Sequence, residues 1–127
     1  MEKGEGYLNG ARNNPWRLAK VPARGKHLVH VDADKGERVY WGLRVLDEGR
    51  GITMHAAATP RGGELHEVEQ EVLLPPSKHK GGKASEGRLD ASGSVTANFD
   101  SHCVFCFDNS HSRMQSKTLE YRIWAAS

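Results

Sequence analysis

The segment Arg38-Val39-Tyr40-Trp41-Gly42-Leu43-Arg44-Val45 alternates in polarity along its whole length. This period of two is typical of a β-strand with one face in the core, because successive side chains point to opposite faces of a sheet. The expected inner positions are Val39, Trp41, Leu43 and Val45, and the expected outer positions are Arg38, Tyr40 and Arg44. The segment therefore predicts a half-buried strand with a tryptophan in the core.

The same alternation recurs on both sides of this segment. The other residues expected on inner faces are Val29, Val31, Ile52, Met54, Ala56, Ala58, Val95, Ala97, Phe99, Cys103, Phe105, Phe107, Leu119, Tyr121 and Ile123. Strands return about every 12 residues with turns between them, and no convincing amphipathic helix interrupts them. The sequence therefore predicts an all-β fold, an antiparallel β-sandwich or barrel.

Two segments are less regular. Residues 1–20 are expected to form an irregular N-terminal arm, with Trp16 and Leu18 anchoring it as an edge strand or a lid, so that 21–127 form the main domain. Residues 64–74 fit two structures. Leu65, Val68 and Val72 stand at helical spacing among glutamates, whereas a period of two favours a strand like its neighbours, so both stay open.

A basic, glycine-rich stretch covers residues 75–88 and predicts a flexible loop. Its lysines are Lys78, Lys80 and Lys83, with Arg61 and Arg88 nearby in the sequence. Such a cluster binds anionic lipid at about 1 kcal/mol per basic residue near the surface. The alternative is a soluble loop whose charges prevent aggregation.

Composition excludes several classes of protein. The chain has 127 residues, enough for one domain, and its 18 basic and 16 acidic residues are too evenly balanced for nucleic-acid binding. No stretch reaches the roughly 18 apolar residues of a membrane span. Residues 1–10 contain no apolar segment, so no signal peptide is expected, and two cysteines are too few for a secreted disulfide scaffold. A cytosolic origin is the simplest expectation.

No catalytic, cofactor-binding or metal-binding residue is expected. Cys103 and Cys106 spell C-x-x-C, but in a strand they point to opposite faces about 10 Å apart, too far for a disulfide. The histidines are His27, His30, His55, His66, His79, His102 and His111, and no pair has the spacing of a helical metal site. The chain also lacks a nucleophile elbow and a phosphate-binding glycine loop.

Residues 104–123, VFCFDNSHSRMQSKTLEYRI, resemble the C-terminal signature of the GOLD (Golgi dynamics) domain. In that signature an apolar strand ends in Phe-Asp-Asn, a serine follows, and a lysine opens the last strand. The matching positions are Phe107, Asp108, Asn109, Ser112 and Lys117, and Trp41 matches the central tryptophan of an earlier strand. The resemblance extends loosely back to residue 21. Ser101-His102-Cys103 replaces the family's usual Gly-x-Tyr, so the turn there is expected to differ.

The resemblance implies a β-sandwich of about eight strands with jelly-roll-like topology and no catalytic activity. GOLD domains occur in cytosolic lipid-transfer proteins, in Golgi adaptors and in the lumenal part of cargo receptors that cycle between endoplasmic reticulum and Golgi. Cys106 resembles a position that cargo receptors use for a disulfide, but this chain has no upstream cysteine to pair with it. The resemblance is therefore closer to the cytosolic lipid-transfer and Golgi-adaptor type.

The functional expectation is a non-catalytic protein-interaction and membrane-adaptor module in Golgi or vesicle trafficking or in lipid transfer. It would bind an unidentified protein partner, with help from an anionic lipid or phosphoinositide surface, and would be cytoplasmic with peripheral attachment to Golgi or endosomal membranes. One alternative is a lumenal cargo-binding domain. Another is a metal-binding or enzymatic β-sandwich.

Overall fold

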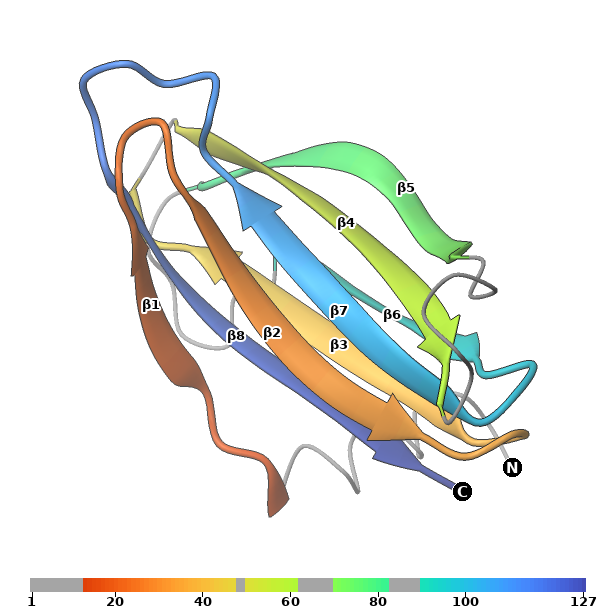
Figure 1. Ribbon diagram of the computed structural model, residues 1–127. Coiled ribbons are helices and arrows are strands. Elements are labelled where there is room, and N and C mark those ends of the chain that lie inside the picture. Colours follow the sequence, from red (N-terminus) through yellow and green to blue (C-terminus); the bar gives the residue numbers. More distant parts are fainter. Residues whose placement is uncertain (1–12, 48–49, 62–69, 83–89) are drawn as a thin grey trace.

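A computed structural model describes residues 13–47, 50–61, 70–82 and 90–127. Within them it contains eight β-strands, and the predicted all-β class is confirmed (Figure 1). Their bounds are β1 Arg17–Val21, β2 Lys26–Ala33, β3 Arg38–Val45, β4 Gly51–Pro60, β5 Glu71–Lys80, β6 Ala91–Thr96, β7 Ser101–Asp108 and β8 Lys117–Ala126. Among these residues there is no helix with the length and apolar character to cross a membrane.

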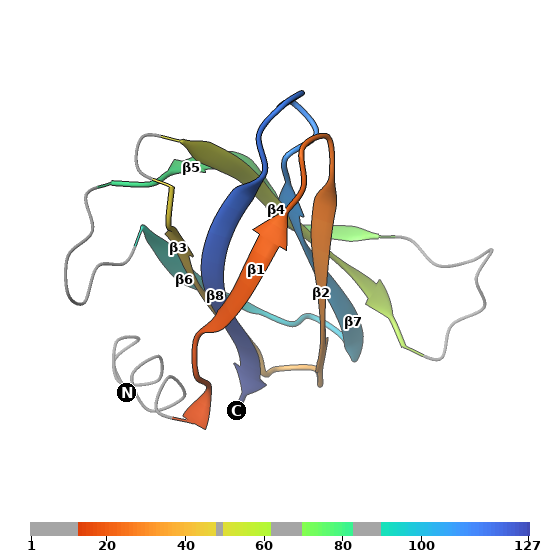
Figure 2. The same cartoon turned by 90° about the vertical axis from the view of Figure 1, so that its left-hand side faces the viewer.

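The strands form two four-stranded sheets in which every pair is antiparallel. One sheet has the order β1-β8-β3-β6 and the other the order β2-β7-β4-β5, and the two lie face to face (Figures 1 and 2). Only β4 and β5 are neighbours in both sequence and space; the other connections cross between the sheets. This arrangement is an eight-stranded jelly-roll sandwich, as predicted.

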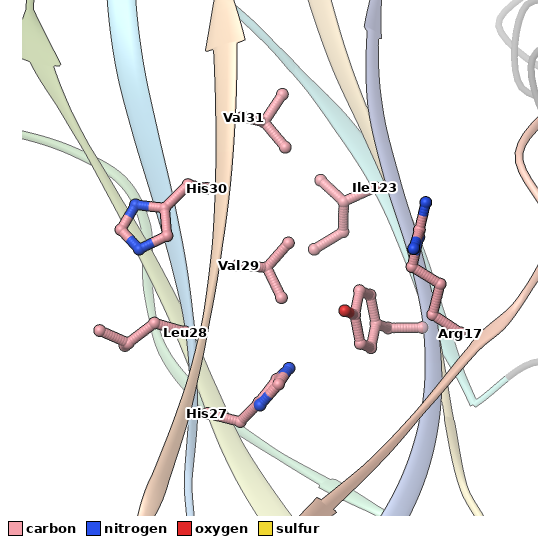
Figure 3. Close-up of a pocket in the computed structure, with 8 residues that line it drawn as sticks. Arg17, His27, Leu28, Val29, His30, Val31 and Ile123 are labelled. Carbon is pink, nitrogen blue, oxygen red and sulfur yellow. The ribbon is translucent and has the colours of Figure 1, made fainter.

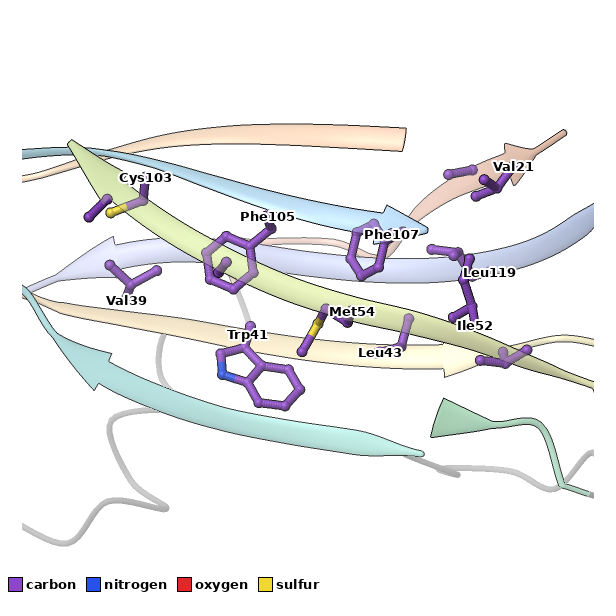
Figure 4. Close-up of a cluster of buried hydrophobic side chains, with 14 of the residues drawn as sticks. Val21, Val39, Trp41, Leu43, Ile52, Met54, Cys103, Phe105, Phe107 and Leu119 are labelled. Carbon is purple, nitrogen blue, oxygen red and sulfur yellow. The ribbon is translucent and has the colours of Figure 1, made fainter. Parts of the chain in front are cut away.

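The core lies between the sheets and uses the predicted inner faces. Val39, Trp41, Leu43 and Val45 of β3 are all buried, and Phe105 and Phe107 of β7 lie opposite them (Figure 4). The other predicted inner positions are either buried or packed against this cluster, namely Val29, Val31, Ile52, Met54, Ala56, Ala58, Val95, Ala97, Phe99, Cys103, Leu119, Tyr121 and Ile123. Alternation alone therefore located the core.

One outer residue of β3 is buried for a reason that alternation does not reveal. Tyr40 points to the outer face, yet only 7% of it is exposed. Its ring stacks on Trp124 of the neighbouring β8, with centroids 5.4 Å apart and an interplanar angle of 17°. A cross-strand aromatic pair of this kind shields both rings from water.

The prediction of an irregular arm over 1–20 is wrong for residues 17–20, which belong to β1 at the edge of its sheet. The edge-strand interpretation is confirmed, but its anchors differ. Leu18 is 69% exposed, whereas Ala19 and Val21 enter the core. Trp16 contacts β3 through a cation–π interaction, because the guanidinium of Arg44 lies 3.9 Å from its ring centroid. Residues 1–12 lie outside the described part of the chain.

The predicted loop over 75–88 is also wrong for residues 75–80, which continue β5 as far as Lys80. β5 lies at the edge of its sheet, where prolines such as Pro75 and Pro76 are tolerated. A register shift opposite β4 adjusts the strand, so Val72 is exposed while Leu74 packs on the core. The strand interpretation of 64–74 is thus confirmed for residues 71–74; residues 62–69 are not described.

His79 shows why β5 is ordered. It lies opposite Ile52 of β4, and its ring centroid is 6.2 Å from that of Trp41 in the core. Burial lowers the pKa of His79, so the neutral imidazole is the form that fits this position. The lysines on either side of His79 are exposed, which keeps the charges of this strand in water.

We expect Trp41→Ala to reduce the free energy of unfolding by about 3–5 kcal/mol, because it removes a large buried side chain and leaves a cavity. Leu18→Ala is the matched control and should change stability by less than about 0.5 kcal/mol, since Leu18 is exposed. Urea unfolding of both variants measures the difference. Equal midpoints for Trp41→Ala and the wild type would contradict the assignment of Trp41 to the core.

Candidate functional site

One end of the sandwich collects turns and strand ends from both sheets. The β1–β2 turn, the β7–β8 loop, the start of β4 and the end of β5 meet there (Figure 1). The registers agree, because Val21 pairs with Lys117, Lys26 with Asp108, and Gly51 with Lys80. We call the residues 21–26, 45–51, 78–82 and 108–117 that are described here the basic end.

A buried asparagine holds this end together. Asn109 is fully buried, and its Nδ2 lies 3.3 Å from the carbonyl oxygen of Val21, 3.1 Å from that of Pro22 and 2.9 Å from that of Gln115. Its backbone N–H donates to the carbonyl of Gly25 at 2.9 Å. One side chain therefore joins the β1–β2 turn to both sides of the β7–β8 loop.

The two turns are also bonded directly to each other. Arg24 has a φ of 63°, a left-handed conformation that is uncommon for a residue with a side chain. Its backbone N–H donates to the carbonyl of Ser112 at 2.8 Å. In turn, the hydroxyl of Ser112 donates to the carbonyl of Gln115 at 3.1 Å. The position of the loop side chains is therefore set by a connected backbone network.

The basic end carries many more cations than carboxylates. Its cationic residues are Arg24, Lys26, Arg50, Lys78, Lys80, Arg113 and Lys117. The carboxylates among its described residues are Asp47 and Asp108, and both bind backbone N–H groups: Asp47 accepts from Thr118 at 2.6 Å and Asp108 from Ser110 at 2.7 Å. The hydrogen bonds from Ser110 lower the pKa of Asp108. A positive surface results.

Exposed apolar side chains accompany these charges. Met114, in the β7–β8 loop, is 91% exposed, and Leu46, which follows β3, is 42% exposed. Large apolar side chains exposed within a charged surface are typical of a binding site for a protein or a membrane, because they contribute nothing to the core.

The opposite end of the sandwich has a different charge pattern. The carboxylates Asp32, Asp34, Glu37 and Asp100 lie there, and Arg61 contacts Asp34 at 2.5 Å and Asp100 at 3.8 Å. These partners raise the pKa of Arg61, chiefly through the hydrogen bond to Asp34. The cations Lys35, Arg38 and Arg61 lie there too, so the described residues of this end carry only a small excess of negative charge, and we call it the acidic end.

The structure brings together only part of the predicted membrane-binding cluster. Lys78 and Lys80 lie at the basic end, but Arg61 follows the other end of β4, about 30 Å away along a ten-residue strand. The grouping of Arg61 with these lysines is therefore wrong. β4 and β5 run antiparallel, so the end of β4, which Arg61 follows, lies far from the end of β5 that carries the lysines. Lys83 and Arg88 lie outside the described residues.

The residues of the family motif converge at this end. Phe107 is buried just before the corner, Asp108 and Asn109 form it, and Ser112 lies in the loop. Lys117 is 6% exposed, and its Nζ lies 3.4 Å from Nε2 of His111. Trp41 belongs to the core instead. Sequence reasoning missed Arg24, Lys26, Arg50 and Arg113 as members of the site, because each stands alone in sequence and only the topology brings them together.

A second surface lies along the free edge of β2. A cavity of about 370 Å³ there is lined by Arg17, His27, Leu28, Val29, His30, Val31, Tyr121 and Ile123 (Figure 3). Gly25 pairs with the N–H of Asn109, so the alternation of an antiparallel ladder directs the N–H groups of His27, Val29 and Val31 to β7. The N–H groups of Leu28 and His30 therefore face the free edge.

Two of the histidines, His30 and His102, form a polar cluster with Asp32, and the two cysteines are separate buried thiols. Nδ1 of His102 lies 2.7 Å from Asp32, and its Nε2 lies 3.0 Å from Nδ1 of His30. The hydrogen bond from His102 lowers the pKa of Asp32. Within the described ranges no three His, Cys, Asp or Glu side chains form a metal-binding group. Cys103 and Cys106 are free and buried, and burial raises the pKa of both thiols, which favours the unreactive protonated form.

No protein-family model matches this chain, and no curated protein matches it. The GOLD resemblance therefore stays a prediction that depends on the motif residues. The function of the chain has to be inferred from the geometry of its two surfaces, the basic end and the free edge of β2.

We expect Asn109→Ala to lower the free energy of unfolding by about 2–4 kcal/mol, because it removes a buried carboxamide together with its hydrogen bonds to the carbonyls of Val21, Pro22 and Gln115. Ser110→Ala is the control, since Ser110 is exposed and its backbone N–H still reaches Asp108. Chemical unfolding measures both variants. A cost near zero for Asn109→Ala would show that water replaces the carboxamide and that the corner does not depend on it.

Proposed function

We propose that this protein is a non-catalytic adaptor module that docks its basic end on an anionic membrane and binds a protein partner elsewhere. The observation that carries the proposal is the concentration of positive charge at one end of the sandwich. Seven cations face two engaged carboxylates among the described residues of the basic end, although the whole chain has a net charge of only +2. The resemblance to GOLD domains supports the same conclusion independently.

The physical basis is additive electrostatics with a small apolar contribution. Each lysine or arginine near an anionic leaflet contributes about 1 kcal/mol, and the attraction falls off within about 8–10 Å at physiological salt. Met114 and Leu46 lie at the same end and are exposed enough to enter the interfacial region. The opposite end is nearly balanced in charge, so the basic end determines the orientation.

The cellular setting that we propose is the cytoplasmic side of Golgi, endosomal or vesicle membranes, in trafficking or lipid transfer. The free state of both cysteines supports this branch over a lumenal cargo-binding domain, because Cys106 makes no disulfide. Its burial on the sheet also leaves it inaccessible to a partner thiol.

Co-sedimentation with vesicles tests the membrane half of the proposal. We expect binding to vesicles that contain phosphatidylserine, weaker binding at higher salt, and none to neutral phosphatidylcholine. The double variant Lys78→Gln and Lys80→Gln should bind these vesicles more weakly by about tenfold or more, because two cations are lost. Lys35→Glu is the matched control: it changes the net charge by the same two units but lies at the acidic end.

Equal losses in the double variant and in Lys35→Glu would mean that net charge alone drives binding and that the basic end has no special role. No binding of the wild type to any vesicle would contradict the membrane function and leave the protein-interaction function.

The protein-interaction half is supported by the free edge of β2. An extended segment of a partner can add to such an edge, where main-chain hydrogen bonds provide affinity and neighbouring cavities provide specificity. In the cavity beside β2, Val29, Val31 and Ile123 provide apolar side chains (Figure 3). Arg17 and Tyr121 also line it. A partner strand with alternating apolar side chains and an acidic residue fits this chemistry.

Proline substitutions test strand addition at this edge. Leu28→Pro removes an N–H that points away from β7, so we expect a folded protein that no longer retains its partner in affinity capture from cell extract. Val29→Pro is the contrast, because it breaks a hydrogen bond between β2 and β7. It should lower the free energy of unfolding by about 3 kcal/mol or more. Retention of the same partners by folded Leu28→Pro would exclude strand addition at β2.

A further inference from the structure

Lys117 is a cation in an unusual place. It opens β8, its side chain shares the inward face of Leu119, and only 6% of the residue is exposed. Among the described residues no carboxylate lies within ion-pair distance of it, and its ammonium has the imidazole of His111 as its neighbour, 3.4 Å away. A buried charge is costly unless a charge of opposite sign accompanies it.

Two cations and one carboxylate among the described residues act on the charge of Lys117. Burial lowers the pKa of Lys117, and the positive charges of Lys78 and Arg50 lower it further. Asp47 opposes this effect, but its Oδ2 is engaged by the backbone N–H of Thr118 at 2.6 Å. The net effect of burial and of these three charges is a lowered pKa of Lys117.

The side chain of Lys78 lies over the start of β4. Gly51 is buried there, and a Cβ at this residue would lie 2.7 Å from Cε of Lys78. The lysine stem therefore reaches the strand end that follows Arg50 in the sequence. Lys78 comes from β5, Arg50 precedes β4 and Lys117 opens β8, so three separate segments supply the cations.

From this geometry we propose that Lys117, Lys78 and Arg50 form a binding site for a phosphate monoester group, with His111 beside it. The site deepens the proposed function, and it rests on that function in so far as the phosphate belongs to a lipid headgroup. The ligand would supply negative charge in addition to that of Asp47. Binding would then relieve the repulsion among the three cations.

A phosphate monoester fits better than the other anions of a membrane. It carries about −1.5 to −2 charges near neutral pH and has three oxygens that accept hydrogen bonds, enough for donors from three segments. A phosphodiester or a carboxylate carries a single charge and accepts from fewer directions. Phosphoinositide headgroups and soluble phosphate compounds share this monoester chemistry, and the experiment separates them.

The corner around Asn109 prepares the site before a ligand arrives. Asn109 fixes the loop that carries His111 through its bonds to Val21, Pro22 and Gln115. The backbone of Leu46 donates to the carbonyl of Thr118 at 2.9 Å, which joins the end of β3 to the start of β8. Little ordering is therefore needed on binding, which favours affinity.

The test compares two probes and two variants. The probes are inositol 1,4,5-trisphosphate in titration calorimetry, and vesicles with phosphatidylinositol 4-phosphate against phosphatidylserine vesicles of equal surface charge. Lys117→Met removes the charge and keeps the stem, so the fold should be retained with unchanged or higher thermal stability. Lys26→Met is the control at the same end, because Lys26 lies opposite Asp108 on another strand.

We expect the wild type to bind the soluble trisphosphate and to prefer the phosphoinositide vesicles. Lys117→Met should weaken both by about tenfold or more, and Lys26→Met by much less. A protein that binds the soluble trisphosphate but no vesicle would support the site and contradict the membrane function. Equal binding to both vesicle types, with equal effects of the two variants, would overturn the site and leave membrane docking intact. An absence of all binding would overturn both.

Discussion

The buried carboxamide of Asn109 is the interaction on which the functional end of this protein depends. The amide donates to carbonyls on both sides of the sandwich, from the β1–β2 turn and from the β7–β8 loop. The bond to Val21 is buried, and the other two reinforce carbonyls that also accept from the N–H of Gly25 and from the hydroxyl of Ser112. The same bonds place Arg24, Arg113, Met114 and Lys117 on one surface. A structural residue thus determines where the charges of the molecule lie.

Concentrating cations at one end has a cost for the fold and an advantage for binding. Burial lowers the pKa of Lys117, the positive charges of Lys78 and Arg50 lower it further, and both effects work against the folded state. Asp47 opposes them in part, while its Oδ2 also accepts from the backbone N–H of Thr118. The jelly-roll core tolerates this arrangement because its stability comes from apolar packing of both sheets around Trp41, Phe105 and Phe107. Stability and recognition are therefore located in different parts of one small domain.

β5 shows where sequence reasoning fails and why. Its prolines, lysines and glycines are typical of a loop, and local composition favoured one. In the structure, pairing with β4 supplies the backbone hydrogen bonds, a register shift adjusts the strand, and His79 packs against Trp41. None of these contacts is local in sequence. The same reason explains Arg61, which is close to the basic segment along the chain but lies at the far end of β4, beside Asp34 and Asp100.

The sequence by itself determined the class of fold, the inner faces of the strands and the corner at Phe107-Asp108-Asn109. It could do so because side-chain alternation and turn chemistry are local properties of the chain. Only the tertiary structure decided which strand ends meet, and with them the composition of the basic end. Arg24, Arg50, Lys78 and Lys117 are scattered over more than ninety residues, and the crossing connections of the jelly roll bring them to one surface. Charge that looks balanced along the chain is thereby separated in space.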